Sequence, residues 1–228
     1  MPGQRLPHHI AFIMDGNRRW ARKHQLPTFW GHRRGIHALL EVVRNALRLH
    51  IPYITVFAFS TENWKRTDTE IRYLMNLFYR SMIYFQKWIA KHSIQVNFIG
   101  DRTALSPALQ EEMAKLEKFS ESNRALTLTI AINYGSRDEI VRAIQKLDLN
   151  DLKFIDWKLL YNHLDTHTLP DVDLMVRTSG EQRLSNFLLL QSAYAEIIFS
   201  EKLWPEYTEN DFLEALEIYQ QRKRNFGK

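Results

Sequence analysis

The sequence contains no cysteine. Disulfide frameworks, thiolate metal sites and cysteine nucleophiles are therefore excluded, and the absence fits a reducing, cytoplasmic location. No apolar run approaches the roughly 20 residues that a helix needs to cross a bilayer. The first residues, MPGQRLPHH, lack the apolar stretch of a signal peptide. We therefore expect a chain that is neither secreted nor membrane-spanning.

Several widespread phosphate-binding and hydrolase signatures are also missing. The chain has no GxGxxG after its first apolar run, no GxxxxGK[ST] and no GxSxG. Dinucleotide-binding, P-loop and nucleophile-elbow sites are therefore disfavoured. It also has no HExxH and no Cys/His spacing typical of zinc, which disfavours a zinc hydrolase.

The chain contains enough apolar residues to form a sizeable hydrophobic core. The 228 residues are 45% hydrophobic, and no repeat, low-complexity tract or Pro/Gly-rich linker divides them, so we expect a single domain over residues 1–228. The formal net charge of +5 suits a phosphorylated substrate, a nucleic acid or an anionic membrane surface. The basic residues are spread along the chain rather than gathered in a tail, which disfavours nucleic acid.

Short apolar runs and amphipathic segments alternate along the whole chain. This alternation is typical of a parallel sheet flanked by helices, so we predict an α/β fold with a mostly parallel six-stranded sheet. The predicted strands are Ile10–Met14, Tyr53–Phe59, Ile94–Ile99, Leu126–Ile132, Asp173–Val176 and Ala195–Phe199. One predicted helix begins near Arg18, and the others span Ile36–His50, Glu70–Lys91, Pro107–Ser122, Asp138–Lys146, Asp156–His163 and Glu209–Phe226.

The stretch HHIAFIMDGNRRW organises the first part of the chain. An apolar strand ends at Asp15-Gly16-Asn17, and a helix begins directly afterwards. The free backbone N–H groups of such a helix start, together with the helix dipole, favour an anion. Asp15 fits beside an anion if a hard cation such as Mg²⁺ lies between its carboxylate and phosphate oxygens. The alternative is an ordinary strand–turn–helix connection with Asp15 as N-cap.

Similar polar clusters follow other predicted strands. Ser60 to Arg66 follows the second strand, Arg177 to Asn186 follows the fifth, and Gly31 to Gly35 opens a helix. The carboxyl ends of parallel strands form the edge where ligands bind in open α/β sheets. Arginines gathered there repel one another unless anions lie between them, and guanidinium groups bind phosphate oxygens bidentately. The pattern therefore predicts two phosphate-bearing ligands, or one long one, although a single arginine after a strand is commonly just a solvated residue.

Two further features leave alternatives open. The apolar segment Glu70–Lys91 is either a core-facing helix or one wall of an apolar cavity. Glu196 lies inside the apolar run AYAEIIF, where a carboxylate needs a cation or a metal as partner. His32 alone is more typical of a hydrogen-bonding residue at a helix start than of a catalyst.

Taken together, the motifs resemble those of the cis-prenyltransferase family. The matching stretches are HIAFIMDGNRRWA, GHRRG, FAFSTENWKR, NYGSR, VDLMVRTSGEQRLSNFLL and LWPEY, in this order and over nearly the whole chain. The resemblance implies a homodimer whose sheet edge opens onto a hydrophobic tunnel. It also implies an enzyme that extends an allylic diphosphate, such as farnesyl diphosphate, with isopentenyl diphosphate units and forms Z double bonds. The expected product is a polyprenyl diphosphate made at the membrane surface. The first candidate is undecaprenyl diphosphate, the precursor of the carrier lipid for bacterial cell-wall glycan.

The resemblance also implies roles for individual residues. Asp15 holds Mg²⁺ against a diphosphate, Glu196 is a second carboxylate near the metal, and Asn63 and Arg66 act at the reacting centre. The allylic diphosphate is bound by Gly16, Asn17, Arg19 and His32, and the diphosphate of isopentenyl diphosphate by Arg177, Arg183 and Ser185, with Glu181 arranging that site. Trp64 shapes the loop around the reacting centre, and Trp20, Ser60 and Glu62 complete the substrate-binding set.

The chain departs from the family pattern at three positions. Thr28 replaces an arginine that usually precedes the second motif, so one diphosphate contact is missing or comes from Arg33 or Arg34. Ile36 and Ile132 stand where many long-chain members have alanine, and they would shorten the product if both face the tunnel. The alternatives to long-chain synthesis are therefore a shorter product, transfer to another acceptor or joining of the units in another pattern, and a non-catalytic partner subunit.

Overall fold

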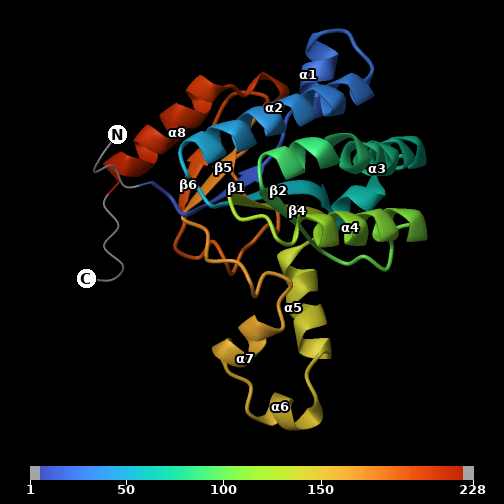
Figure 1. The fold of residues 1–228 in the computed structure, drawn as a ribbon, viewed down its shortest axis with the longest axis vertical. Coiled ribbons are helices and arrows are strands. Elements are labelled where there is room, and N and C mark those ends of the chain that lie inside the picture. The colour runs from blue at the N-terminus through green and yellow to red at the C-terminus, as the bar shows by residue number, and fades with distance from the viewer. Residues whose placement is uncertain (1–5, 223–228) are drawn as a thin grey trace.

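Strands and helices alternate around one sheet in the computed structural model, which describes residues 6–222 (Figure 1). The strands are β1 (His9–Ile13), β2 (Tyr53–Ser60), β3 (Ile94–Ile99), β4 (Leu126–Tyr134), β5 (Leu174–Arg177) and β6 (Glu196–Phe199). They lie in the order β3-β4-β2-β1-β5-β6, and every pairing between neighbours is parallel. The predicted six-stranded α/β sheet is confirmed.

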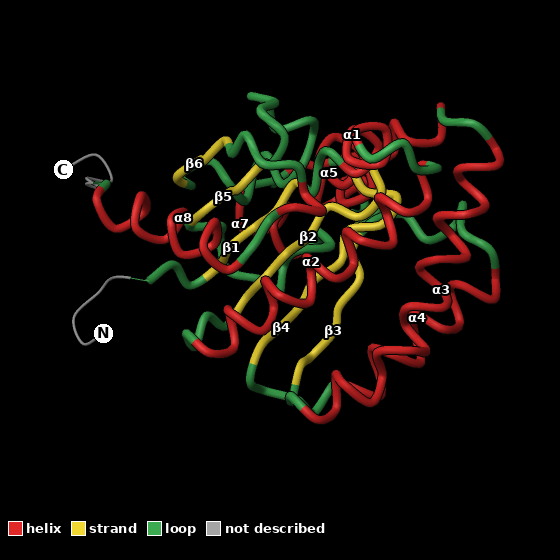
Figure 2. Tube along the Cα trace, turned by 90° about the horizontal axis from the view of Figure 1, so that it is seen from above, coloured by secondary structure: helices red, strands yellow, loops and turns green. Residues whose placement is uncertain are grey.

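Helices cover the sheet unequally on its two faces. α2 (Thr28–Arg48), α3 (Asp68–Lys91), α4 (Pro107–Ser120) and α8 (Glu209–Gln221) cover one face, and the view from above shows α2 and α8 lying across the strands (Figure 2). The opposite face packs against a smaller apolar cluster from the 184–195 loop. The strands are apolar on both faces, as expected for a buried parallel sheet.

The remaining helices lie at two ends of the molecule. α1 (Asn17–Lys23) packs on the start of α2, while α5 (Ser136–Gln145), α6 (Leu149–Lys153) and α7 (Trp157–Asn162) extend away from the sheet (Figure 1). We call residues 136–162 the arm. α6 is absent from the sequence prediction, and the last part of the predicted helix Glu209–Phe226 lies outside the described residues. No helix among residues 6–222 is long and apolar enough to span a bilayer.

α2 begins at Thr28, eight residues before the predicted start at Ile36. The two glycines of GHRRG lie inside the helix rather than at its opening. A Cβ on Gly31 would lie 2.0 Å from the backbone oxygen of Asn17, and one on Gly35 would lie 2.4 Å from the Asn17 side-chain oxygen. The two glycines therefore allow α1 to pack closely on α2. This packing places Asn17 beside the carboxyl ends of the strands.

This packing makes a stability prediction for Gly31→Ala. In an ordinary helix interior the change stabilises by about 1 kcal/mol. Here the added methyl group meets backbone, so we expect a net loss of about 2 kcal/mol in the free energy of unfolding. Urea denaturation measures the difference, with His37→Ala, an exposed position on the same helix, as control. An unchanged or higher unfolding free energy for Gly31→Ala would contradict the close packing of α1 on α2.

Candidate active site

A cavity of about 310 Å³ opens at the carboxyl ends of the central strands. Its inner part lies between the sheet and the helices α2 and α3. The lining there is apolar and includes Leu39, Val43, Leu74, Phe78, Phe85, Trp88, Ile89 and Ile130. Of the two interpretations of Glu70–Lys91, the structure supports a cavity wall as well as a core helix, since α3 contributes to both.

The outer end of the cavity is lined by polar residues that the sequence had singled out. Asp15 and Asn17 come from the turn after β1, Ser60 and Asn63 from the end of β2, and His32, Arg66, Arg177 and Ser185 from the surrounding elements. The clusters predicted to share one sheet edge do meet there. A polar mouth on an apolar pocket suits a molecule with a charged head and a hydrocarbon tail.

Asp15 and Arg177 form the central ion pair of this mouth. Ile13 at the end of β1 pairs with Arg177 at the end of β5, and this register places the two side chains together. The Arg177 side chain is only 4% exposed, and its Nη2 donates to Asp15 Oδ2 at 2.9 Å. Its Nη1 donates to Ser185 Oγ at 2.7 Å and to the Arg183 carbonyl at 2.5 Å. Buried charges are stable only when paired and hydrogen-bonded, so Arg177 is held rigidly.

A second group of charges lies beside this pair. The Glu181 carboxylate accepts from Arg183 at 2.5 Å and lies 3.2 Å from Arg19 Nη2, which also donates to Ser179. Arg19 and Arg183 are about half exposed. Two guanidinium groups thus share one carboxylate at the rim, where an incoming anion can compete for them.

A third group surrounds Glu70 at the start of α3. Its carboxylate lies 3.0 Å from Arg66 Nη1, 3.6 Å from His32 Nε2 and 4.0 Å from Arg18 Nε. Burial lowers the pKa of His32 to about 4, with Arg66 adding to the effect and Glu70 opposing it, so His32 is neutral at physiological pH. Burial also lowers the pKa of Arg66, against the attraction of Glu70.

Glu70 is the main residue of the site that sequence reasoning missed. It lies in the first turn of α3, where an acidic residue is an ordinary helix-start signal, and its backbone N–H is capped by Thr67. No sequence pattern distinguishes this carboxylate from a helix-dipole residue. Only the packing of α3 against α1 and α2 shows that it faces Arg66, Arg18 and His32.

The turn after β2 is held by its own hydrogen bonds. Ser60 and Asn63 form a capping box, and Trp64 Nε1 donates to Asn133 Oδ1 at 2.7 Å. Asn186 donates to Glu62 at 3.3 Å and so joins this turn to the loop after β5. Glu62 and Trp64 therefore support the turn, while Ser60 and Asn63 line the cavity.

The turn after β1 has no side-chain cap on its helix. Gly16, with φ of 106°, is the N-cap of α1, so the alternative that Asp15 caps the helix is wrong. Asn17 Nδ2 donates to the Met14 carbonyl at 3.1 Å, whereas Asn17 Oδ1 is buried without a hydrogen-bond partner. Trp20 lies against His24, with ring centroids 4.3 Å apart, and is not among the cavity-lining residues. The substrate-binding role of Trp20 stays a prediction.

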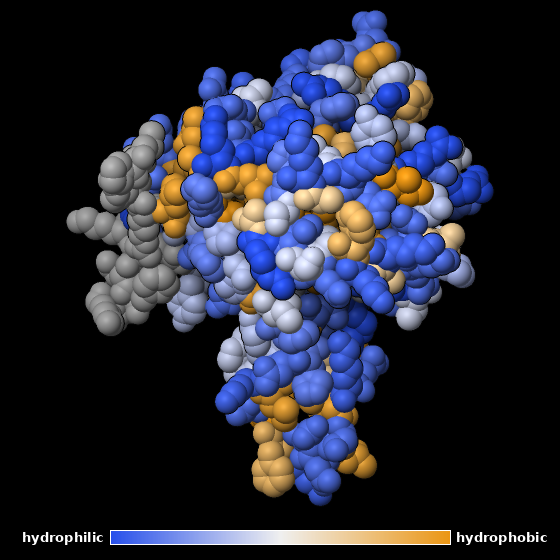
Figure 3. Space-filling model, viewed as in Figure 1, coloured by the Kyte–Doolittle hydropathy of each residue, from blue (hydrophilic) through white to orange (hydrophobic). Residues whose placement is uncertain are grey.

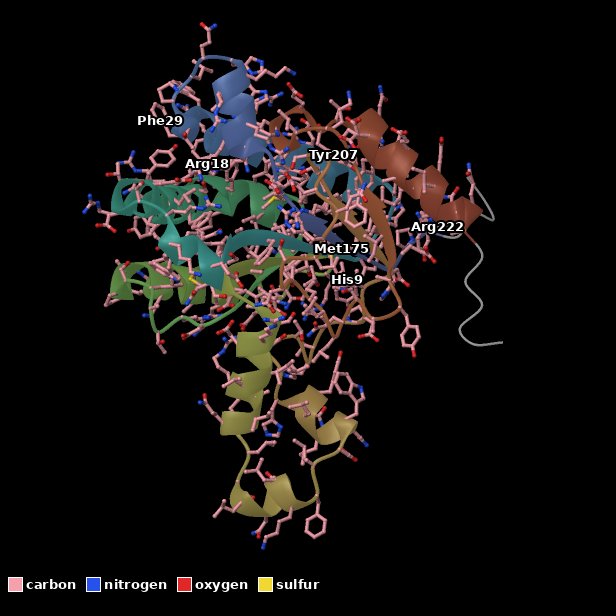
Figure 4. All side chains as sticks on the ribbon, turned by 180° about the vertical axis from the view of Figure 1, so that it is seen from behind. His9, Arg18, Phe29, Met175, Tyr207 and Arg222 are labelled. Atoms are coloured by element: carbon pink, nitrogen blue, oxygen red, sulfur yellow. The ribbon has the colours of Figure 1, made fainter. Side chains whose placement is uncertain are left out.

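Glu196 is also not brought to the site. It is the first residue of β6, so it lies at the amino end of the sheet, three residues of strand, or about 10 Å, from the edge that carries Asp15. Its carboxylate accepts from Arg222 Nη1 at 2.8 Å, and Figure 4 shows Arg222 on the other side of the molecule from Arg18. The structure therefore does not bring Asp15 and Glu196 together within one chain, and a metal-binding role for Glu196 stays a prediction.

The structure shows where the three positions that depart from the family pattern lie. Ile36 and Ile132 both line the cavity. Thr28 is the first residue of α2, and neither Arg33 nor Arg34 lines the cavity; Arg33 lies over the Trp30 ring at 5.2 Å. The arginine that lies near the mouth is instead Arg18, whose Nε is 4.0 Å from the Glu70 carboxylate.

Comparisons with known proteins agree with this geometry. The family model described as "Putative undecaprenyl diphosphate synthase" matches residues 13–227. The ditrans,polycis-undecaprenyl-diphosphate synthase ((2E,6E)-farnesyl-diphosphate specific) of Pasteurella multocida is 44% identical over 228 residues, which cover 97% of this chain and 95% of that protein.

Two solved structures share the fold at 33% identity each. Lavandulyl diphosphate synthase from Lavandula x intermedia, in complex with dimethylallyl diphosphate, superposes with a TM-score of 0.92. A probable undecaprenyl diphosphate synthase from Campylobacter jejuni superposes with a TM-score of 0.82. Both alignments cover 98% of this chain and 99% of the other. With its motifs, its fold and a family match over nearly its whole length, this chain belongs to the prenyltransferase family of undecaprenyl diphosphate synthases.

Proposed function

We propose that this protein condenses isopentenyl diphosphate with an allylic diphosphate, farnesyl diphosphate being the expected primer, and builds undecaprenyl diphosphate with Z double bonds. The observation that carries the proposal is the cavity itself, which joins a mouth of cations and hydroxyls to an apolar interior. A prenyl diphosphate has the same division between charged head and hydrocarbon tail. The 44% identity to a farnesyl-specific undecaprenyl diphosphate synthase supports the same substrates.

The basic side chains of the mouth form two sets. Arg177, Arg183 and Arg19 contact Asp15 or Glu181, and Arg66, Arg18 and His32 contact Glu70. Arginine binds diphosphate oxygens bidentately, and neutral His32 can donate one further hydrogen bond. Two sets suit two diphosphates, with the isopentenyl group held by the Arg177 set and the allylic group by the Arg66 set.

The reaction requires the allylic C–O bond to break while the alkene of isopentenyl diphosphate forms the new C–C bond. Negative charge grows on the departing allylic diphosphate, and the guanidinium group of Arg66, in the set that would hold it, is placed to stabilise it. The rigid hold on Arg177 fixes the second substrate, so the reacting carbons meet in line. The apolar wall of α3 keeps the growing chain away from water. The condensed product loses one proton, which passes to a diphosphate oxygen, to water or to a side chain.

The residues of the mouth fit Mg²⁺ shared with a substrate rather than a metal held by protein alone. Within residues 6–222 no group of three or more His, Asp or Glu side chains could cage an ion. Asp15 is about one-third exposed, and Mg²⁺ is commonly bound by one or two carboxylates plus phosphate oxygens and water. We therefore propose that Asp15 holds Mg²⁺ against a diphosphate. When bound, the ion would neutralise charge on the leaving diphosphate.

Asp15→Ala tests this assignment. We expect turnover with Mg²⁺ to fall at least about 100-fold, because the carboxylate that would hold the ion is removed. The protein should stay folded by circular dichroism, since Arg177 keeps its bonds to Ser185 and Arg183. Asp101→Ala is the matched control: Asp101 follows β3 and does not line the cavity. Activity of Asp15→Ala close to that of wild type would remove Asp15 from the mechanism.

A second candidate function rests on a specific observation. The TM-score of 0.92 to lavandulyl diphosphate synthase, together with Thr28 in place of the usual arginine, favours joining of the units in another pattern. A non-catalytic partner subunit is disfavoured because Asp15, Arg66 and Arg177 meet at one mouth. The products of the isolated protein distinguish these functions.

The cavity wall predicts how product length is controlled. Ile36→Ala/Ile132→Ala should shift the products made from farnesyl and isopentenyl diphosphates by roughly one isoprene unit toward longer chains, because both side chains line the cavity. Chromatography of the products measures the shift, and Ile83→Ala, 49% exposed on α3, is the control. Unchanged chain lengths would exclude these residues as the limit. A product formed by a single condensation with a branched linkage would instead support the second candidate function, in which the units are joined in another pattern.

We propose that the arm joins two copies of the chain in a homodimer. Leu149 and Phe154 are each 81% exposed, and Trp157 and Val141 are more than half exposed. Figure 3 shows hydrophobic side chains at the end of this projection. The arm carries five basic and five acidic residues, so its apolar surface suits another protein better than a charged membrane.

Leu149→Ser/Phe154→Ser should lower the molecular mass measured by light scattering toward that of one chain. The change removes apolar area that a dimer would bury. Tyr84→Ser, at a residue 78% exposed on α3, is the matched control and should leave the mass unchanged. A variant mass equal to that of wild type would place the dimer interface elsewhere.

A further inference from the structure

A second exposed apolar surface lies at the end of the molecule opposite the arm. Leu26, Phe29 and Trp30, in the α1–α2 turn and the first turn of α2, are each about 40% exposed. The turn is well defined, since Leu26 N–H donates to the Ala21 carbonyl at 2.8 Å. Phe29 packs on Tyr73 at 5.6 Å, which fixes the turn against α3. We call residues 18–34 the knob.

The knob differs from the arm in charge. Residues 16–40 contain six Arg or Lys and no Asp or Glu, whereas the rest of the chain carries 25 basic and 26 acidic residues. The net positive charge of the protein is therefore concentrated here. In the described part of the chain, Arg22, Arg33 and Arg34 have no carboxylate within 4 Å, while Lys23 pairs with Glu206.

The knob also borders the cavity mouth. His32, two residues after Trp30, lines the cavity, and Arg18 faces Glu70 at its edge. Figure 4 shows Phe29 at the outer end of the molecule, near Arg18. Figure 3 shows a few hydrophobic side chains within a largely hydrophilic surface at this end. Whatever the knob binds therefore lies close to the point where substrates enter.

We propose that the knob docks the enzyme on an anionic lipid bilayer, with Leu26, Phe29 and Trp30 entering the interface and the surrounding arginines facing acidic headgroups. Aromatic side chains favour the membrane–water interface, and clustered basic residues are attracted to anionic lipid. A protein partner would not explain a segment with six basic and no acidic residues, of which Arg22, Arg33 and Arg34 face no carboxylate in the described part of the chain. A nucleic acid would not explain exposed Leu26. The docking deepens the proposed function, since it places the mouth that handles lipid substrates beside the bilayer.

Vesicle co-sedimentation of the full chain tests the proposal. The probes are vesicles of phosphatidylcholine alone and vesicles with one-third phosphatidylglycerol, at low and at 0.5 M salt. Wild type should bind the anionic vesicles, bind the neutral ones weakly, and lose binding in high salt. Arg22→Gln/Lys23→Gln should bind at least about fivefold more weakly, since one basic residue near the surface contributes roughly that factor. Leu26→Ser/Phe29→Ser should also bind at least about fivefold more weakly, because it removes apolar side chains that would enter the interface.

Matched controls lie on α3. Ile83→Ser/Tyr84→Ser removes exposed apolar side chains, and Lys87→Gln/Lys91→Gln removes two exposed charges, in each case away from the knob. Both should bind anionic vesicles as wild type does. Circular dichroism confirms the folding of each variant before the binding comparison.

The proposal is overturned if wild type ignores anionic vesicles or if the knob variants bind like wild type. It is also overturned if single-stranded RNA binds as tightly as the vesicles and the apolar variant keeps that binding. Turnover measured in detergent distinguishes a failure of the docking proposal from a failure of the proposed function. If turnover is normal but the knob variants bind vesicles as wild type does, the docking proposal is wrong and the proposed function stands. If vesicle binding depends on the knob but no prenyl transfer is measured, the proposed function is wrong and the docking proposal stands.

Discussion

The contact on which the site depends is the ion pair between Asp15 and the buried Arg177. A guanidinium group that is 4% exposed needs nearby acceptors for its charge, and both terminal nitrogens of Arg177 have them, whereas its buried Nε has no hydrogen-bond partner within residues 6–222. Asp15, Ser185 and the Arg183 carbonyl supply them, and each comes from a different point along the loops after β1 and β5. The pair therefore ties two loops to adjacent parallel strands, and the rest of the mouth is built around it.

Glu70 provides the complementary half of this electrostatic arrangement. Arg66 and Arg18 would repel one another if no carboxylate lay between them, and neutral His32 lies beside the same carboxylate. A diphosphate entering the mouth offers the same cations a second anion and competes with Glu70 for them. Burial keeps His32 neutral, so two full positive charges face Glu70 rather than three.

The two exposed apolar surfaces show how charge selects a partner for similar hydrophobic area. The arm is electrically balanced, and neutrality permits a second copy of the same surface to approach. The knob carries the net charge of the whole protein, and a second knob would be repelled by it. Apolar area alone does not distinguish a protein interface from a membrane interface, but the surrounding charges do.

The sequence by itself determined the parallel sheet and the edge that carries the site, because apolar runs followed by polar clusters mark the strand ends on which Asp15 and Arg177 lie. It did not determine contacts between segments distant along the chain. Gly31 and Gly35 resembled a helix opening, yet they lie within α2 where α1 packs closely. Glu70 resembled an ordinary helix-start residue, and the sequence did not show that strand register places Glu196 at the opposite end of the sheet from Asp15. Spacing along a strand or helix follows from local geometry, whereas the neighbour of a side chain across the fold depends on packing that only the tertiary structure decides.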